Sequence, residues 1–126
     1  MTATINATFR QAAEAGGDSL YLAFSGEPWS YRRVAQEVER LARGLHALGI
    51  RRGDRVAGLL ENGPDALIAW YAVNRIGAVH VPVNTAYKGE FLRHQVSDSG
   101  ARIVVCEAEY LDDVLAVASG LPALER

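Results

Sequence analysis

The 126-residue sequence has very little of the residue types on which common reactive sites are built. Cys106 is its only cysteine, which excludes an internal disulfide and any metal site made of several thiolates. Because Cys106 ends an apolar run, a buried and unreactive thiol is favoured over a nucleophile. Lys88 is the only lysine, and neither G-x-x-x-x-G-K-[ST] nor G-x-G-x-x-G occurs. Both common glycine-rich phosphate cradles are therefore absent from this sequence.

The charge balance and the length of the apolar runs argue against two further kinds of partner. The formal net charge is -2, which indicates no basic surface for nucleic acid. No apolar stretch approaches the roughly 18 residues that a membrane span needs. Residues 1–10 lack the charged and then apolar pattern of a signal peptide. We therefore expect a cytoplasmic protein of one domain, without a nucleic-acid partner or a transmembrane segment.

What the sequence does contain is a repeated unit of one strand and one helix. Short apolar runs begin after Gly53, Gly77 and Gly100, so the starts lie 24 and 23 residues apart. This spacing is typical of successive strand and helix units in a parallel α/β sheet. The runs predict strands at 55–60, 79–83 and 103–106. Right-handed crossovers are expected between them.

Capping residues and apolar periodicity predict helices before, between and after these strands. Ser30 is a suitable N-cap, and the apolar residues behind it recur at steps of three and four along one helix face. These residues are Tyr31, Val34, Val38, Leu41, Leu45 and Leu48. Glu39 and Arg43 have the spacing of an ion pair on the opposite side of that helix. Further helices are predicted at 5–15, 64–76, 89–98 and 109–119.

The segment before the long helix predicts a β-hairpin. Apolar residues 20–24 and the aromatic run 29–31 flank Ser25-Gly26-Glu27-Pro28, which has the composition of a turn. The predicted fold is therefore three-layer α/β, with a mostly parallel sheet, flanking helices and an N-terminal hairpin. Buried parallel strands need helices on both faces, and further strands are expected at the edge of so small a sheet.

Few residues are candidates for a site. The three histidines, His46, His80 and His94, show no metal-ligand spacing. His80 lies in the strand 79–83 and is the best placed of them, because ligands of open α/β sheets bind at strand ends. The acidic pairs Glu107 with Glu109 and Asp112 with Asp113 resemble paired carboxylates, but acids favoured at a helix N-terminus explain them better. No catalytic, cofactor-binding or metal-binding residue is therefore assigned.

Several phrases of the sequence, in their order and spacing, resemble one family. They are Trp29-Ser30-Tyr31 before the long helix, the runs 48–57 (LGIRRGDRVA) and 60–64 (LENGP), and the runs 75–84 (RIGAVHVPVN) and 99–105 (SGARIVV). Together they cover about residues 20 to 120. They resemble the opening segment of the ATP-dependent, adenylate-forming (AMP-binding) acyl-CoA synthetase/ligase family.

The resemblance implies a reaction and a set of cofactors. In this family ATP and a carboxylate give an acyl-adenylate and pyrophosphate with Mg²⁺, and coenzyme A then displaces AMP. The family holds ATP with a Thr/Ser/Gly-rich loop bearing a lysine, a later acidic motif and a lysine of a mobile C-terminal domain. None of these has a counterpart in residues 1–126, and Lys88 matches none of them. We therefore transfer no catalytic residue to this chain.

The resemblance narrows the acyl substrate only a little. In the acetate-activating branch two arginines contact the coenzyme A phosphate, and the matching positions are approximately Asp112 and Leu115, which are not basic. The run 84–92 (NTAYKGEFL) is similar to members that activate fatty acids, carnitine-type acids or small dicarboxylates. The acetate branch is therefore disfavoured, and these other classes remain open.

The resemblance implies that residues 1–126 are the N-terminal part of an AMP-dependent synthetase/ligase domain. ATP, Mg²⁺ and CoA are expected for the whole enzyme, but none of them for this chain alone, which we predict to be inactive. The alternative is a non-catalytic interaction or oligomerisation module, since an unfinished sheet leaves surface to cover. A free-standing flavodoxin-like nucleotide binder is disfavoured, because it needs a phosphate-binding loop after the first strand. The segment there, Glu61-Asn62-Gly63-Pro64, carries a negative charge and a proline, which has no backbone N–H to donate.

Overall fold

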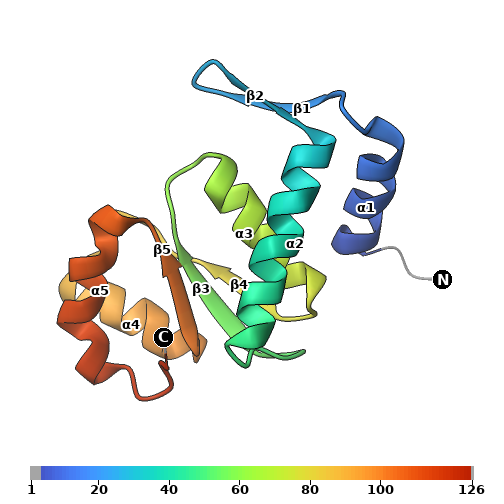
Figure 1. Cartoon of the computed structure of the whole chain (residues 1–126). Coiled ribbons are helices and arrows are strands. Elements are labelled where there is room, and N and C mark those ends of the chain that lie inside the picture. The colour runs from blue at the N-terminus through green and yellow to red at the C-terminus, as the bar shows by residue number, and fades with distance from the viewer. Residues whose placement is uncertain (1–3, 126) are drawn as a thin grey trace.

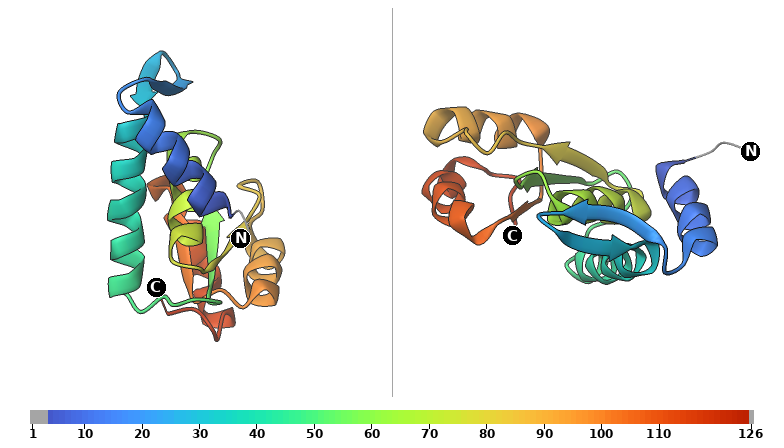
Figure 2. Two further views of the ribbon diagram at one scale, coloured as in Figure 1. Left: turned by 90° about the vertical axis from the view of Figure 1, so that its right-hand side faces the viewer. Right: turned by 90° about the horizontal axis from the view of Figure 1, so that it is seen from above.

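The computed structural model describes residues 4–125 as a parallel sheet between helices, with a β-hairpin at one end (Figures 1 and 2). In chain order the elements are α1 (Ile5–Gly16), β1 (Leu20–Phe24), β2 (Glu27–Ser30), α2 (Tyr31–Ala47), β3 (Arg55–Leu59), α3 (Pro64–Arg75), β4 (Val79–Pro82), α4 (Gly89–Ser99), β5 (Ile103–Cys106) and α5 (Leu111–Val117). Short 3₁₀ turns at Ala108–Tyr110 and Ala118–Gly120 flank α5. The predicted elements are thus present, and most of their bounds shift by one residue or none.

The parallel sheet has the strand order β4-β3-β5, so its central strand is the first of the three in the chain. Val56 of β3 pairs with His80 of β4 on one side and with Ile103 of β5 on the other. The chain therefore leaves β3 toward β4 and then crosses over β3 to reach β5. This crossover requires α3 and α4 to lie on opposite faces of the sheet if both connections are right-handed.

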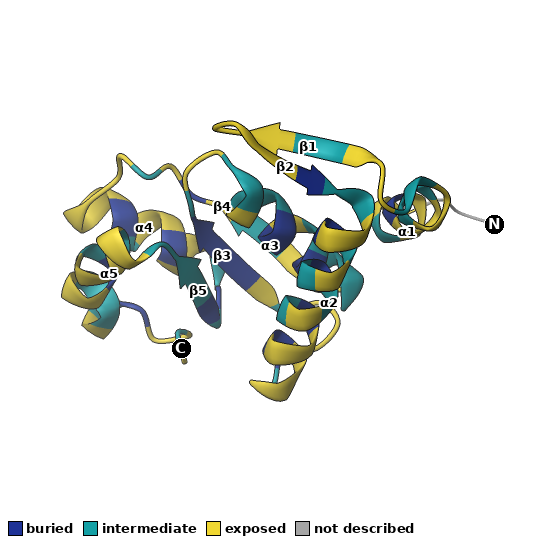
Figure 3. Cartoon of the chain, turned by 45° about the horizontal axis from the view of Figure 1, so that its top comes forward, coloured by how far each residue is buried: buried dark blue, intermediate teal, exposed yellow. Residues whose placement is uncertain are grey.

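Alternate residues of β3 are buried against two different helix layers. Val56 packs in a cluster with Leu45 of α2. Leu59 is buried in another cluster with Leu92 of α4 and Val114 of α5. Figure 3 shows β3 buried along most of its length, while the outward sides of the helices are exposed. The predicted three-layer α/β fold is confirmed.

The hairpin has a tighter turn than the sequence predicts. β1 and β2 pair antiparallel, and only Ser25 and Gly26 lie between them. Their φ angles are 50° and 79°, and positive φ at both central residues is typical of a type I′ turn. The predicted four-residue turn is therefore wrong, because Glu27 and Pro28 already belong to β2.

Aromatic side chains of α1 and of the hairpin pack against α3. The ring of Phe9 stacks on that of Tyr71, with centroids 4.2 Å apart. The hydroxyls of Tyr21 and Tyr71 are hydrogen-bonded at 2.7 Å. Burial and, after it, this hydrogen bond raise the pKa of Tyr21 to about 12. The Tyr21 hydroxyl therefore stays protonated. Through the ring contact of Phe9 with Tyr71, α1 joins the layer formed by α2 and α3.

Helix α2 begins at the predicted cap. The Ser30 side chain accepts a hydrogen bond from the Arg33 backbone N–H at 3.0 Å. Such a cap satisfies one of the first N–H groups, which have no partner within the helix. Val34, Val38 and Leu45 of the predicted stripe are buried. The stripe therefore forms the packing face of the helix, as predicted.

Three predicted details differ in the structure. Leu48 is 51% exposed because it is the C-cap residue, beyond the last helical turn. Glu39 forms an ion pair with Arg75 of the neighbouring α3 at 3.2 Å, instead of the predicted pair with Arg43. The predicted helix 109–119 is one α-helical segment between two 3₁₀ turns. The second difference arises from tertiary packing, which helix spacing alone does not include.

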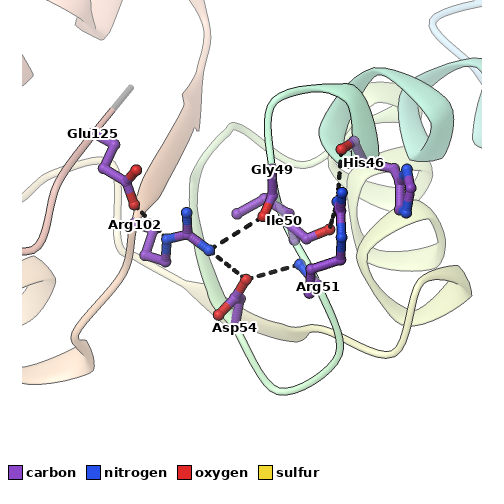
Figure 4. A network of polar contacts seen from close by, with 7 residues as sticks. All are labelled: His46, Gly49, Ile50, Arg51, Asp54, Arg102 and Glu125. Atoms are coloured by element: carbon purple, nitrogen blue, oxygen red, sulfur yellow. Dashed lines mark hydrogen bonds and ion pairs between the residues drawn. The ribbon is translucent and has the colours of Figure 1, made fainter.

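A network of polar contacts closes the amino edge of the sheet (Figure 4). The Arg102 guanidinium donates to the Asp54 carboxylate at 2.5 Å and to the Gly49 carbonyl at 3.2 Å, and it also pairs with the Glu125 carboxylate. The Arg51 backbone N–H donates to the same oxygen of Asp54 at 2.7 Å. This N–H and then the Arg102 charge lower the pKa of Asp54. Because ligands of open α/β sheets bind at the opposite edge, we interpret this network as structural.

Candidate functional site

The carboxyl ends of β3 and β5 form the crevice in which this kind of sheet binds ligands. Strand β3 continues into α3 on one face, whereas β5 continues into α5 on the other. Adjacent strands whose connections diverge in this way leave a crevice, and ligands of open α/β sheets bind there. We therefore take the crevice between β3 and β5 as the candidate functional site.

A cavity of about 430 Å³ lies in this crevice, between the sheet, α2 and α3. Its apolar wall includes Leu41 of α2, Leu60 after β3 and Val105 of β5. Its charged side chains are Glu37, Arg40, Asp65 and Glu107. The volume is within the ordinary range of small-molecule pockets and therefore does not discriminate between ligands. The charged side chains of the lining decide which ligand groups can bind.

The charged lining is acidic, with three carboxylates and one guanidinium. Arg40 is already paired with Glu37, with Nη1 and Oε1 3.0 Å apart. One carboxylate oxygen of Glu107, Oε2, is buried and has no hydrogen-bond partner within residues 4–125. Burying a hydrogen-bond acceptor without a partner costs free energy of folding. An N–H group or a cation that donates to this oxygen would remove that cost.

The same crevice is unsuited to a triphosphate. Helix N-termini bind phosphate through free backbone N–H groups and the positive end of the helix dipole. Here α3 begins at Pro64, which has no N–H, and continues with the acidic Asp65. Glu61 precedes the helix and adds a further negative charge. The geometry therefore excludes α3 as a phosphate cradle.

Cys106 lies in the wall of the cavity and is only half-buried. Burial raises the pKa of its thiol. Nucleophilic cysteines require a lowered pKa, because the thiolate is the reactive form. The structure therefore supports the interpretation of Cys106 as an unreactive thiol.

Polar side chains join the three loops at the carboxyl edge of the sheet. The Tyr110 hydroxyl donates to the Glu61 carboxylate, and this hydrogen bond lowers the pKa of Glu61. Lys88 Nζ lies 2.8 Å from Asp113 Oδ2, so the only lysine of the chain ties the loop after β4 to α5. These contacts are exposed, and such pairs contribute little to stability. Their effect is to hold the three loops in one arrangement.

The other predicted candidates are spread over the molecule and form no common site. His46 and His94 are exposed on α2 and α4. Glu109 lies in the 3₁₀ turn before α5, and Asp112 in the first turn of α5, as expected for acids at a helix start. Within residues 4–125 no three His, Cys, Asp or Glu side chains are placed to hold a metal ion. In the same residues no helix is long and apolar enough to cross a membrane.

His80 is not at a strand end facing the crevice. It is the second residue of β4, pairs with Val56 and is half-buried. Its Nε2 is buried without a hydrogen-bond partner within residues 4–125 and lies over Gly58, 2.7 Å from the point where a Cβ there would stand. Burial lowers the pKa of His80, so the imidazole is neutral near pH 7.

This burial predicts a pH-dependent stability. Since the pKa of His80 is lower in the folded chain than in the unfolded chain, the unfolded chain binds more protons between the two values. The free energy of unfolding should therefore fall as the pH falls below about 6.5, by at most about 1.4 kcal/mol per pH unit. Denaturant titrations from pH 5 to pH 8 measure this slope. His80→Gln should reduce it, whereas replacement of the exposed His94 by glutamine should not; equal slopes in both variants would contradict the assignment.

Sequence reasoning missed the charged lining of the crevice. Glu37, Arg40 and Asp65 carry no motif, and their approach to Glu107 depends on how α2 and α3 pack on the sheet. The position of Glu107 directly after a strand was a usable signal, because strand ends meet at one edge. The sequence interpretation assigned this residue to a helix start instead.

The chain is similar to known CoA ligases. The model of the AMP-binding enzyme family matches residues 9–126. A feruloyl-CoA synthase from Amycolatopsis sp is 40% identical over 95 residues, which are 75% of this chain and 19% of that protein. A crotonobetaine/carnitine–CoA ligase from Salmonella paratyphi A is 35% identical over 103 residues, which are 78% of this chain and 20% of that protein. The chain thus spans about a fifth of the length of these curated relatives.

A solved structure agrees with these relatives. The inhibitor-bound N-terminal domain of FACL13 from Mycobacterium tuberculosis matches with a TM-score of 0.90 and 27% identity, over 98% of this chain and 32% of that one. The shared fold therefore includes the hairpin, the long helix and the parallel sheet. Since the family model covers nearly all of the chain as well, this protein belongs to the AMP-binding enzyme family.

Proposed function

We propose that residues 1–126 are the N-terminal part of an ATP-dependent acyl-CoA synthetase, which converts a carboxylate, ATP and CoA to acyl-CoA, AMP and pyrophosphate. The match of the family model to residues 9–126 is the observation that carries this proposal. The relatives that share this segment are named as CoA ligases of feruloyl, crotonobetaine and carnitine groups. The proposed substrate is therefore a carboxylic acid, and the proposed location is the cytoplasm.

In this proposal the described residues are scaffold, and other parts of the ligase hold ATP, Mg²⁺ and CoA. Transfer of the adenylyl group from ATP to a carboxylate, with pyrophosphate leaving, needs cationic donors or a metal aimed at the phosphate oxygens. The crevice at the carboxyl edge presents carboxylates instead, and Arg40, the one guanidinium that the described residues contribute to its lining, is paired with Glu37. Lys88 is also paired, with Asp113. Among residues 4–125, the crevice therefore offers a triphosphate no unpaired cation.

Pyrophosphate release tests this proposal. The assay compares the 126-residue chain with the full-length gene product that begins with it, each with Mg·ATP, CoA and one of three acids: ferulate, carnitine or a long-chain fatty acid. We expect the full-length enzyme to turn over at least one acid at a rate within the usual range of about 1–1000 s⁻¹, and the chain alone to stay at background. Turnover by the chain alone, or a folded full-length protein that makes no thioester from any acid, would refute the proposal.

The alternative, an interaction module, has one specific observation in its favour. Phe91 of α4 is 76% exposed and Leu115 of α5 is 61% exposed, and both are large apolar side chains. Sedimentation of the 126-residue chain at several concentrations separates the two functions. A monomer at all concentrations supports a scaffold without its own oligomerisation, whereas a stable dimer favours the alternative.

A further inference from the structure

The loop between β3 and α3 contains the only Asn-Gly pair of the chain, Asn62-Gly63. Asn62 is exposed, and Figure 1 shows this loop at the carboxyl end of β3. The side-chain carbonyl of an asparagine can be attacked by the backbone nitrogen of the next residue. Glycine hinders this attack least, because it has no Cβ and its backbone is the most mobile. The pair therefore has the composition that favours a reaction of the chain with itself.

The structure leaves both reacting groups of this pair without a competing contact. Within residues 4–125, neither the Asn62 side chain nor the Gly63 N–H makes a hydrogen bond. Gly63 is the N-cap residue of α3, and only its carbonyl is bonded, by the Leu67 N–H at 3.3 Å. The Gly63 nitrogen and the Asn62 amide can therefore react without first breaking a hydrogen bond of the fold.

The other three asparagines are restrained, and none of them precedes a glycine. The side-chain amide of Asn74 donates to a backbone carbonyl one turn earlier in α3, at 2.8 Å. The side-chain oxygen of Asn84 accepts from the backbone N–H two residues later, at 2.9 Å. Asn6 lies in α1, where the N–H of the next residue donates to Thr4 Oγ1 at 3.0 Å. The fold therefore separates Asn62 from the other members of its residue type.

Packing of the hairpin favours glycine at position 63. A Cβ there would stand 3.3 Å from Cζ of Phe24, the last residue of β1, which is closer than an ordinary contact. The φ of Gly63 is 163°, an extended angle that other residues also adopt. The close approach of the Phe24 ring, and not the backbone conformation, is therefore the reason for the small residue after Asn62.

We propose that Asn62-Gly63 is a site of spontaneous deamidation. The Gly63 nitrogen bonds to Cγ of Asn62, the bond from Cγ to Nδ2 breaks, and ammonia leaves with the proton that the Gly63 nitrogen gives up. Water then opens the resulting succinimide at one of its two carbonyls, which yields aspartate or isoaspartate at position 62. Water is the only co-reactant. The inference does not depend on the proposed function.

Both products add a negative charge to an edge of the sheet that is already acidic. The neighbouring Glu61 carboxylate accepts a hydrogen bond from the Tyr110 hydroxyl. Aspartate keeps the main chain unchanged, and a carboxylate just before a helix N-terminus is favoured by the helix dipole. Isoaspartate instead inserts a methylene into the main chain between β3 and α3. We therefore expect isoaspartate, and not aspartate, to disturb the loop that Glu61 and Tyr110 hold.

Peptide mapping by mass spectrometry tests the site. The 126-residue chain is incubated at pH 6 and at pH 8, its fold is checked by circular dichroism, and the gain of about 1 Da at each asparagine is followed. We expect the gain at Asn62 to be at least about tenfold faster than at the other three asparagines. It should also be faster at pH 8, because the attacking nitrogen must lose its proton. Equal rates at all four asparagines, or no conversion at Asn62, would overturn the inference.

Two variants and an unfolded sample separate this reaction from other losses. Gly63→Ala should slow the conversion at least about tenfold. Asn62→Gln should abolish it, because glutamine would have to close a less favourable six-membered ring. In urea, the rate at Asn62 should change less than about threefold, whereas the rates at the other asparagines should rise as their hydrogen bonds are lost. An unchanged rate in Gly63→Ala, or a large acceleration of Asn62 by urea, would refute the proposed site.

Separation of the aged chain by ion exchange tests the consequence for the loop. The isoaspartate fraction is compared with the Asn62→Asp variant, which has the same charge and an unaltered main chain. We expect the isoaspartate fraction to unfold at a temperature at least about 3 °C below that of the Asn62→Asp variant. We also expect the variant to unfold within about 1 °C of the unreacted chain. Equal midpoints for the isoaspartate fraction and the variant would contradict the expected disturbance of the loop.

Discussion

Leu92→Ala should lower the free energy of unfolding by about 2–5 kcal/mol, which is a large part of the roughly 5–15 kcal/mol that stabilises a domain. Leu92 is fully buried between α4 and the sheet, in the cluster that contains Ala57 and Leu59 of β3. Its truncation removes apolar contacts and leaves a cavity that the surrounding strands and helices cannot close. Urea denaturation followed by circular dichroism measures the change.

The neighbouring residue supplies a matched control for this prediction. Phe91 is larger than Leu92 but is 76% exposed, so Phe91→Ala should change stability by less than about 0.5 kcal/mol. The two variants differ in the direction of the side chain on the same helix turn. An equal loss in both would contradict the described orientation of α4, and it would show that Phe91 is covered in solution.

Gly16→Ala is expected to destabilise the chain by roughly 1–3 kcal/mol, although alanine is the better helix former. A Cβ at Gly16 would stand 2.4 Å from Cδ2 and 2.7 Å from Cγ of the Tyr31 ring. Tyr31 is the first residue of α2, and its ring also lies against that of Tyr21, with centroids 4.6 Å apart. The ring therefore cannot move without disturbing the junction of α1, the hairpin and α2.

Gly44 is the matched control for this second substitution. It lies within α2, and a Cβ there would meet no atom within 4 Å. Gly44→Ala should therefore raise the free energy of unfolding by about 0.5–1 kcal/mol through helix propensity alone. Thermal denaturation of both variants measures the two effects. A stabilised Gly16→Ala variant would contradict the contact between Gly16 and Tyr31.

The strands were predictable because the turns before them have a simple requirement. Gly53, Gly77 and Gly100 all have positive φ, between 70° and 86°, and glycine adopts such angles without the strain that a Cβ causes. Gly77 and Gly100 lie at the ends of α3 and α4, and Gly53 lies in the turn before β3. Each glycine precedes a strand segment, so their spacing in the sequence carries the repeat. The helix starts at Ser30, an N-cap, and at Pro64, the first residue of α3, were predictable for the same reason, since their chemistry is local.

Features that depend on contacts between distant segments were not predictable in this way. The ion pair of Glu39 with Arg75 and the burial of His80 over Gly58 arise only when helices and strands are packed. The acidic crevice likewise gathers Glu37, Asp65 and Glu107 from three separate elements. Local sequence patterns contain helix and strand periodicity, but they do not contain the order of strands in the sheet. The strand order decides which side chains meet at the carboxyl edge.

Equilibrium binding of Mg·ATP to the folded 126-residue chain tests most directly whether these residues are scaffold. The account predicts no saturable heat of binding in titration calorimetry up to about 1 mM nucleotide, a concentration at which even sites of about −4 kcal/mol begin to fill. It also predicts clear binding by the full-length ligase under the same conditions. Saturable micromolar binding by the short chain would contradict the account, because it would place a nucleotide site within these residues.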